Sequence, residues 1–361
     1  MEHPQNPTPT PQISSPQPHA AATTRTLQVQ FTGKAGEYFK IWIVNVFLTV
    51  ITLGIYSAWA KVRNTQYFYG NTTIDGSSFQ YTAKPLQILK GRLIAFACLL
   101  AFSLVGELSP ALGAPLGVLF LGLIPWVLVR SLTFNARNTL YRNVRFNFVG
   151  KTRSAAFELL LMPLASMFTL GLLLPYVLWR QLRFVLSNSR YGTSAFEFTA
   201  GARTCYFIFL KMLLLVLLAV ACLLGTIAFG VVSALGGEDM TVLLLLLVVV
   251  TVLSIIAAVG YQITALYNLR FNHTRLDGVQ LSMNLKAMRT IWIYLTNTVL
   301  ILASFGLMVP WAKVRMALYR ASCAQVHVTG SLDAFVSGQQ EKVSALGDQL
   351  GDVFDLDFSI V

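Results

Sequence analysis

Cysteine and histidine carry the most specific chemistry in this chain, and their spacing argues against a catalytic or metal site. The four cysteines include no CxxC pair, and the four histidines form neither an HExxH motif nor a pair at helical spacing. These residues are Cys98, Cys205, Cys222, Cys323, His3, His19, His273 and His327. Free cysteines in apolar runs are usually buried thiols. We therefore expect no metal, no cofactor and no enzyme activity.

Arginine recurs beside an aromatic residue at the ends of apolar runs. The segment WAKVR occurs at 59–63 and again at 311–315, and Pro125 and Pro175 each precede an arginine by five residues. The candidate interface or headgroup residues are Trp59, Lys61, Arg63, Trp126, Arg130, Tyr176, Arg180, Trp311, Lys313 and Arg315. Aromatic and basic residues anchor helices at membrane interfaces, whereas guanidinium groups also suit phosphate. Both interpretations stay open, an interfacial anchor and a set of sites for anionic lipids or an anionic solute.

A few charged residues lie inside or beside the apolar runs, where a charge is a pointer to function. They are Lys40, Lys90, Glu158 and Lys211. Long basic side chains near helix ends also extend to the headgroups without any further role. Neither long pair of apolar runs holds an acidic residue at mid-span, which argues against a proton-coupled carrier.

The composition of the chain indicates a membrane protein. Of 361 residues, 55% are hydrophobic and 12% charged, and the formal net charge is +12. Soluble domains carry about 25% charged residues, so an ordinary soluble protein is excluded. In so apolar a chain, the basic excess indicates cytoplasmic loops rather than nucleic-acid binding.

Apolar runs divide into long and short ones. Those near 91–107, 113–134, 205–235 and 240–266 match the roughly 20 residues that cross a bilayer. Three shorter runs, 41–60, 155–179 and 291–312, are interrupted, and the expected helix breaks are Gly54, Gly171, Gly306 and Pro310. We expect a mainly α polytopic membrane protein with four transmembrane helices and three broken or re-entrant helical hairpins. Seven single spans are the alternative.

Short alternating segments recur six times, which predicts β-strands in the connections. They begin near residues 29, 79, 146, 196, 281 and 326. Asp75-Gly76 and Asp277-Gly278 are good hairpin turns. Together with the arginine-aromatic exits, these segments indicate five quasi-repeats of strand, membrane segment and exit.

The distribution of charge favours the hairpins over seven spans. If the short units return to the face they entered from, all 27 Lys and Arg lie on one face or at its boundary. By the positive-inside rule that face is the cytoplasm, so both termini are expected there. Irregular backbone at membrane depth must then be buried in protein or line a cavity.

Three regions are expected along the chain. Residues 1–26 are rich in proline and predict a disordered arm without a signal peptide. Residues 27–335 hold the five quasi-repeats, and residues 336–361 form an acidic C-terminal tail whose end, VFDLDFSIV, alternates like a strand.

Several of these segments carry a family resemblance. The sequences FTGKAGEYFKIWIVN and TLGIYSAWAKVRNTQYFYGNT, the returning PWAKVR and the ending FDLDFSIV resemble the YjgN-like family of bacterial inner-membrane proteins of unknown function. The resemblance covers about 28–361 and implies a multi-pass protein of the bacterial inner membrane, but it supplies no catalytic or ligand residues.

Two functions are expected from these patterns. The first is transport or channel activity for a small solute, because broken helices in related positions mark binding sites in transporters. The alternative is a non-catalytic protein that binds membrane lipids, above all anionic ones, or organises the envelope. The sequence does not determine the oligomeric state.

Overall fold

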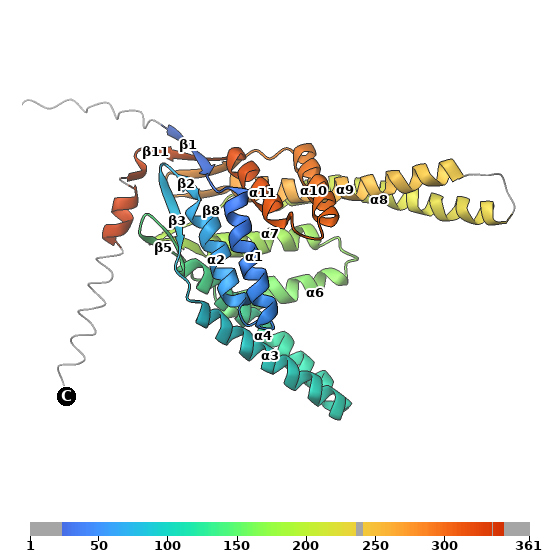
Figure 1. The fold of residues 1–361 in the computed structure, drawn as a ribbon, viewed down its shortest axis with the longest axis horizontal. Helices are drawn as coiled ribbons and strands as arrows, with labels where there is room; N and C mark the ends of the chain where they lie inside the picture. Colours follow the sequence, from blue (N-terminus) through green and yellow to red (C-terminus); the bar gives the residue numbers. More distant parts are fainter. Residues whose placement is uncertain (1–23, 236–240, 334, 343–361) are drawn as a thin grey trace, which may run out of the picture.

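The computed structural model describes residues 24–235, 241–333 and 335–342 and combines one β-sheet with pairs of helices that leave it (Figure 1). The described chain is mainly helical, as expected. The short strands, however, are not separate connections, because they all join one eleven-stranded sheet. The expected fold class is therefore correct in its helices and incomplete in its sheet.

All six expected strand segments are present, and five further strands pair with them. The strands are β1 (Thr24–Phe31), β2 (Thr72–Ile74), β3 (Ser77–Tyr81), β4 (Thr139–Tyr141), β5 (Val144–Phe148), β6 (Ser189–Tyr191), β7 (Ser194–Ala195), β8 (Glu197–Phe198), β9 (Thr274–Leu276), β10 (Val279–Met283) and β11 (Ala324–Thr329). Tight turns join β2 to β3, β4 to β5, β6 to β7 and β9 to β10, and the paired strands are antiparallel. The predicted turns Asp75-Gly76 and Asp277-Gly278 both have positive φ at the two central residues, as two-residue hairpins require.

The sheet is almost closed into a barrel. Its strand order is β7-β6-β5-β4-β3-β2-β1-β11-β10-β9-β8, and the two outermost strands, β7 and β8, are separated in sequence only by Phe196. The first and last described strands pair away from the edges of the sheet, because β1 runs antiparallel to β11 from Thr24 opposite Thr329 to Gln28 opposite Gln325.

Four helices are long and apolar enough to span a membrane, in agreement with the four long runs. They are α3 (Pro85–Leu108), α4 (Pro110–Arg137, apolar from Ala111), α8 (Ala202–Ala234) and α9 (Thr241–Asn272). The pairs α3/α4 and α8/α9 form two long hairpins that extend away from the sheet (Figure 1). Their surfaces expose many large aliphatic side chains, as lipid-facing helices do.

Each short apolar run folds as a helical hairpin. The three hairpins are α1 (Ala35–Ile51) with α2 (Ser57–Gly70), α10 (Ala287–Ala303) with α11 (Val309–Cys323), and α5 (Thr152–Ala155), the π-helical η1 (Ala156–Leu161) and α6 (Met162–Met167) with α7 (Leu174–Ser187). Gly54, Gly171 and Gly306 lie in the turns with φ of +92°, +83° and +90°, so the expected breaks are correct. Pro310 lies in the first turn of α11, where proline fits, and therefore starts the returning helix.

The same hydrogen bond closes the base of every helical hairpin. The backbone N–H just after the entering strand donates to the carbonyl at the end of the returning helix, at 2.9–3.0 Å. The five pairs are Thr32 with Asn71, Thr82 with Asn138, Val149 with Asn188, Thr199 with His273, and Asn284 with Cys323. Both ends of each hairpin are thus fixed at the sheet.

Neighbouring hairpins pack side by side and form a ring. Contacts join α2 to α3, α4 to α5 and η1, α7 to α8, and α9 to α10, and α11 returns to α1. The hairpins therefore follow one another around the ring in the same order as the strands follow one another in the sheet. Apolar side chains fill the sheet interior, among them Leu27, Tyr191, Val326 and Val328.

A helix after β11 covers the end of the sheet remote from the helices. Residues 332–333 and 335–342 are helical, and Val336 packs into the sheet core. The Gln339 amide donates to Ser194 Oγ at 2.7 Å and its carbonyl oxygen accepts from the Thr193 N–H at 3.0 Å. The expected boundary between membrane domain and tail, at 335/336, falls inside this helix. The strand expected in 353–361 and most of the arm, residues 1–23, lie outside the described residues.

Candidate functional site

Each candidate arginine lies over an aromatic ring, and for three of the four this ring belongs to the same helix. The guanidinium carbon lies 5.9 Å from the Trp126 ring centroid for Arg130, 5.7 Å from Tyr176 for Arg180 and 4.9 Å from Trp311 for Arg315. These pairs are four residues apart, and such residues share one face of a helix. Arg63 departs from this spacing, because it lies 5.8 Å from Tyr56, which in turn stacks on Trp59.

The four arginines differ in their other partners. Arg63 and Arg130 are exposed, whereas Arg315 donates to Thr296 Oγ1 at 2.6 Å and to Asn297 Oδ1 at 3.0 Å. Because each arginine lies on a different helix of the ring, the four do not form a single cluster. Lys61 is exposed.

Arg180 has a carboxylate partner that the sequence pattern did not predict. Its Nη2 lies 2.5 Å from Glu158 Oε1. Glu158 lies in η1, and the extra residue per turn of a π-helix often marks a functional site. The second oxygen of Glu158, Oε2, is buried and has no hydrogen-bond partner among the described residues. The charge of Glu158 is therefore paired with Arg180 inside the protein.

A large apolar cavity occupies the sheet interior on the side of the helices. We call it the sheet cavity, and its volume is about 750 Å³, within the ~300–1,000 Å³ typical of small-molecule sites. Aromatic side chains from several strands line it, including Phe31, Phe79, Phe146 and Phe196. Its one charged lining residue among those the structure describes is Arg320.

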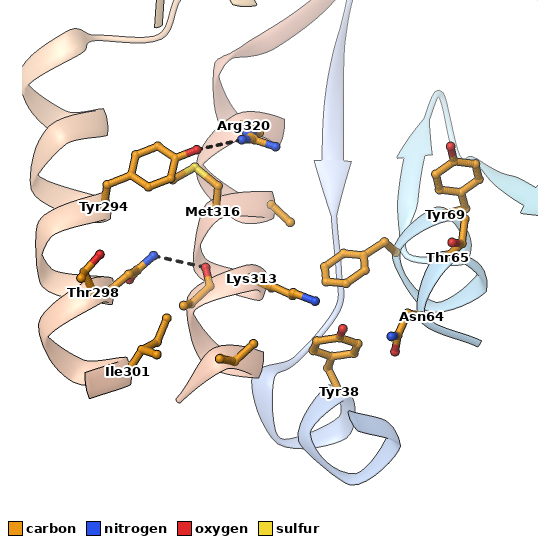
Figure 2. Close-up of a pocket in the computed structure, with 15 residues that line it drawn as sticks. Tyr38, Asn64, Thr65, Tyr69, Tyr294, Thr298, Ile301, Lys313, Met316 and Arg320 are labelled. Carbon is orange, nitrogen blue, oxygen red and sulfur yellow. Dashed lines mark hydrogen bonds between the residues drawn. The ribbon is translucent and has the colours of Figure 1, made fainter. Parts of the chain in front are cut away.

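A second pocket lies below the sheet cavity, between the hairpins α1/α2 and α10/α11 (Figure 2). We call it the helix pocket, and its volume is about 680 Å³. The two spaces share the lining residues Phe68, Tyr69, Ala317 and Arg320. The two spaces therefore adjoin at α2 and α11.

The helix pocket is rich in hydrogen-bond donors. Lys313 and Arg320 line it, and no acidic residue does so in the part of the chain that the structure describes. Figure 2 shows Lys313 pointing from α11 across the pocket towards Tyr38, whose ring centroid is 6.0 Å from Lys313 Nζ. Residues seven apart share a helix face, so Lys313 and Arg320 present two positive charges on one side of α11.

Arg320 is the functional candidate that the sequence pattern missed. Its Nη2 donates to Tyr294 Oη at 3.2 Å, and its guanidinium lies 4.4 Å from the Tyr267 ring centroid. The spacing of seven residues from Lys313 was the one local signal for it. The partners come from α9 and α10, whose approach to α11 is a tertiary contact.

Tyr38 adds an unsatisfied polar group to the same pocket. The residue is fully buried, and its hydroxyl has no hydrogen-bond partner among the described residues. An unpaired buried hydroxyl costs about 1–3 kcal/mol. A ligand or water that accepts this hydrogen bond would remove that cost.

Across the described residues, no group of three or more His, Cys, Asp and Glu side chains lies close enough together to hold a metal ion.

The fold defines a class of protein, a ring of apolar helical hairpins with four membrane-spanning candidates, attached to an almost closed sheet. Comparison with known families agrees, because residues 26–353 match the family described as bacterial protein of unknown function DUF898. The chain belongs to this family.

The curated relatives that the chain matches are named as inner membrane proteins. The chain is 36% identical over 145 residues to the inner membrane protein YjgN of Salmonella typhimurium, which covers 40% of this chain and 37% of the relative. It is 34% identical over 125 residues to that of Escherichia coli K12, covering 33% and 30%. The aligned part thus spans only about a third of each relative. No solved structure matches the chain.

Proposed function

We propose that this protein binds anionic membrane lipids without chemical turnover, as a multi-pass protein of the bacterial inner membrane. The observation that carries the proposal is the stacked arginine at the corresponding place in four returning helices. A guanidinium over an aromatic face can donate to phosphate oxygens those N–H groups that have no protein acceptor, which for Arg315 excludes the group bonded to Thr296 and Asn297. The relatives, named as inner membrane proteins, support the location.

The test compares lipid retained after purification in a mild detergent. Replacing Arg63, Arg130 and Arg315 by Gln should remove most co-purified phosphatidylglycerol and cardiolipin, measured by mass spectrometry. Arg180 is left in place because its pairing with Glu158 gives it a structural role.

The matched control replaces three exposed sheet arginines, Arg145, Arg190 and Arg275, by Gln. This variant loses the same charge away from the helices and should keep its lipid. Equal lipid retention in the wild type and the helix variant would contradict the proposal.

We further propose that the sheet and both termini are cytoplasmic. Because both ends of every hairpin are fixed at the sheet, one face carries all the connections between hairpins. Reporter fusions at residues 1 and 361 should both report cytoplasm. A Leu112→Cys substitution, at the tip of α3/α4, should react with an impermeant thiol reagent from the periplasm, and opposite locations of the two termini would refute this topology.

Transport or channel activity for a small solute is the second candidate. The observation that favours it is that the helix pocket and the sheet cavity adjoin, since they share four lining residues. The helix after β11 covers the far end of the sheet, however, so a solute would need an exit that this arrangement does not provide. A proteoliposome flux screen with ionic and neutral solutes tests it, and the absence of protein-dependent flux would rule it out.

A further inference from the structure

We propose that the sheet cavity and the helix pocket together form an internal binding site for a single-chain amphiphile with an anionic headgroup, of the fatty-acid or lysophospholipid class. This inference rests on the proposed lipid binding and adds a specific internal site to it. The site is separate from the stacked arginines at the membrane boundary.

The apolar half of the site is set by the sheet cavity. Its wall is built from aromatic and aliphatic side chains of strands from both halves of the chain, such as Phe79 and Phe146 on one side and Leu281 and Val326 on the other. Val336, from the terminal helix, closes the far end. A space with such a wall favours an alkyl chain over a polar solute.

The headgroup half of the site lies where the sheet cavity adjoins the helix pocket, and the charged side chains there are positive. Arg320 lies at the junction, where it lines both spaces, and Lys313 lies on the same face of α11 in the helix pocket. The carboxylate or phosphate of an amphiphile would accept hydrogen bonds from Arg320. These bonds are stronger than neutral ones because both partners are charged. A cationic headgroup finds no acidic partner among the described lining residues, and a neutral one leaves the charges of Lys313 and Arg320 without a counter-charge.

The buried Tyr38 hydroxyl is the second, independent sign of a ligand. It faces the helix pocket from α1, opposite Lys313 (Figure 2), and has no partner within the described structure. A headgroup oxygen held between α1 and α11 would supply the missing acceptor. Tyr38, Lys313 and Arg320 thus all line the pocket in which the anionic headgroup would lie.

Binding is measured on the full-length protein in nanodiscs of phosphatidylcholine, which provide no competing anionic lipid. The probes are cis-parinaric acid, whose fluorescence rises in an apolar site, and unlabelled oleate or oleoyl-lysophosphatidylglycerol as competitors. Oleyl alcohol is the neutral control of equal chain length. We expect saturable binding at one site per chain, with competition by at least one of the two anions, which identifies carboxylate or phosphate as the preferred head. Oleyl alcohol should compete at least about tenfold more weakly.

Two variants separate the head and the chain. Arg320→Gln should weaken binding by about tenfold or more, and Ala317→Phe should abolish it by filling the junction of the two spaces. Arg289→Gln is the matched control, because Arg289 also stacks on a tyrosine, Tyr319 at 5.2 Å, but lines neither space. It should bind like the wild type.

A measurement on the wild type protects the test from folding defects in the variants. A fatty acid with a photoreactive diazirine at its methyl end should label peptides of the sheet, such as those containing Phe79 or Phe146. Labelling confined to the lipid-facing surfaces of α3 or α8 would overturn the proposal, as would the absence of saturable binding or equal affinity for oleate and oleyl alcohol.

The internal site and the boundary sites can fail separately. The variant lacking Arg63, Arg130 and Arg315 tests the boundary sites and should still bind cis-parinaric acid. If it loses co-purified lipid while Arg320→Gln and Ala317→Phe bind cis-parinaric acid like the wild type, the boundary proposal stands and the internal site is wrong.

Discussion

Arg142 forms two salt bridges, and we expect the one with Asp75 to contribute much more to the stability of the sheet than the one with Asp333. Replacing Arg142 by Gln removes both. Arg142 lies in the β4–β5 turn and bridges to Asp75 in the β2–β3 turn at 3.0 Å and to Asp333 in the terminal helix at 2.5 Å. It also donates to Ser77 Oγ at 2.9 Å and to the Asp75 carbonyl at 3.0 Å. One side chain thus ties together two hairpin turns and the helix that covers them.

The exposed fractions of the partners set the magnitudes. The Arg142 and Asp75 side chains are 15% and 20% exposed, whereas Asp333 is 78% exposed. An exposed pair contributes at most about 1 kcal/mol, whereas removing one partner of a buried pair costs about 3–5 kcal/mol. Because the pair with Asp75 is only partly buried, we expect a loss of about 2–3 kcal/mol for Arg142→Gln and at most about 1 kcal/mol for Asp333→Asn.

Native-state hydrogen exchange resolves these losses locally. A loss of about 2 kcal/mol corresponds to roughly 30-fold faster exchange, and 1 kcal/mol to roughly fivefold. Peptides covering β2–β5 should therefore exchange at least about 30-fold faster in Arg142→Gln and less than about fivefold faster in Asp333→Asn. Arg145→Gln, an exposed arginine two residues into β5, is the matched control and should leave these rates unchanged. Equal acceleration by Arg142→Gln and Asp333→Asn would refute the reasoning, because it would assign the energy to the exposed pair.

Two further predictions concern packing and pH. A Cβ at Gly260 would lie 2.1 Å from Ile291 Cγ1, so Gly260→Ala should lower the stability of the α9–α10 contact by about 1–3 kcal/mol; a fall in melting temperature checks this, and Gly230→Ala, with no neighbour within 4 Å, should not show it. Burial raises the pKa of Tyr191 above the ordinary value of 10, so its contribution to stability is complete below pH 10 and is lost as the pH rises towards the folded pKa. Melting temperature should therefore fall above pH 10, and Tyr191→Phe should flatten that fall while it removes the hydrogen bond to the Tyr141 carbonyl, a loss of about 1 kcal/mol; an unchanged slope would contradict the assignment.

The sequence predicts those parts of the fold that depend on local signals. Apolar length alone identifies α3, α4, α8 and α9, because a membrane span needs about 20 apolar residues in a row. Gly54, Gly171 and Gly306 mark the hairpin turns, because few other residues adopt a positive φ near 90° without strain. Alternation identifies strands of five or more residues, such as β3 and β10.

The remaining parts depend on contacts between distant residues. Strands β2, β4, β6 and β9 have three residues each, too few to show alternation, and they pair only because each returning helix ends beside a longer strand. The pairing of Arg180 with Glu158 crosses from η1 to α7. Similarly, Tyr38 and Arg320 reach the same pocket only once α1 packs on α11, so a search for short motifs cannot place them together.

The pairing of β1 with β11 has a consequence for biosynthesis. One edge of β1 acquires β2 as soon as the first hairpin has been made, but its other edge waits for residues 324–329. At about 5–20 residues per second, the ribosome needs roughly 15–60 s to synthesise the intervening chain, and this edge of β1 stays unpaired for that time. An open strand edge is a template for wrong pairing, so the nascent protein should depend on chaperones at the membrane surface until its final strand emerges.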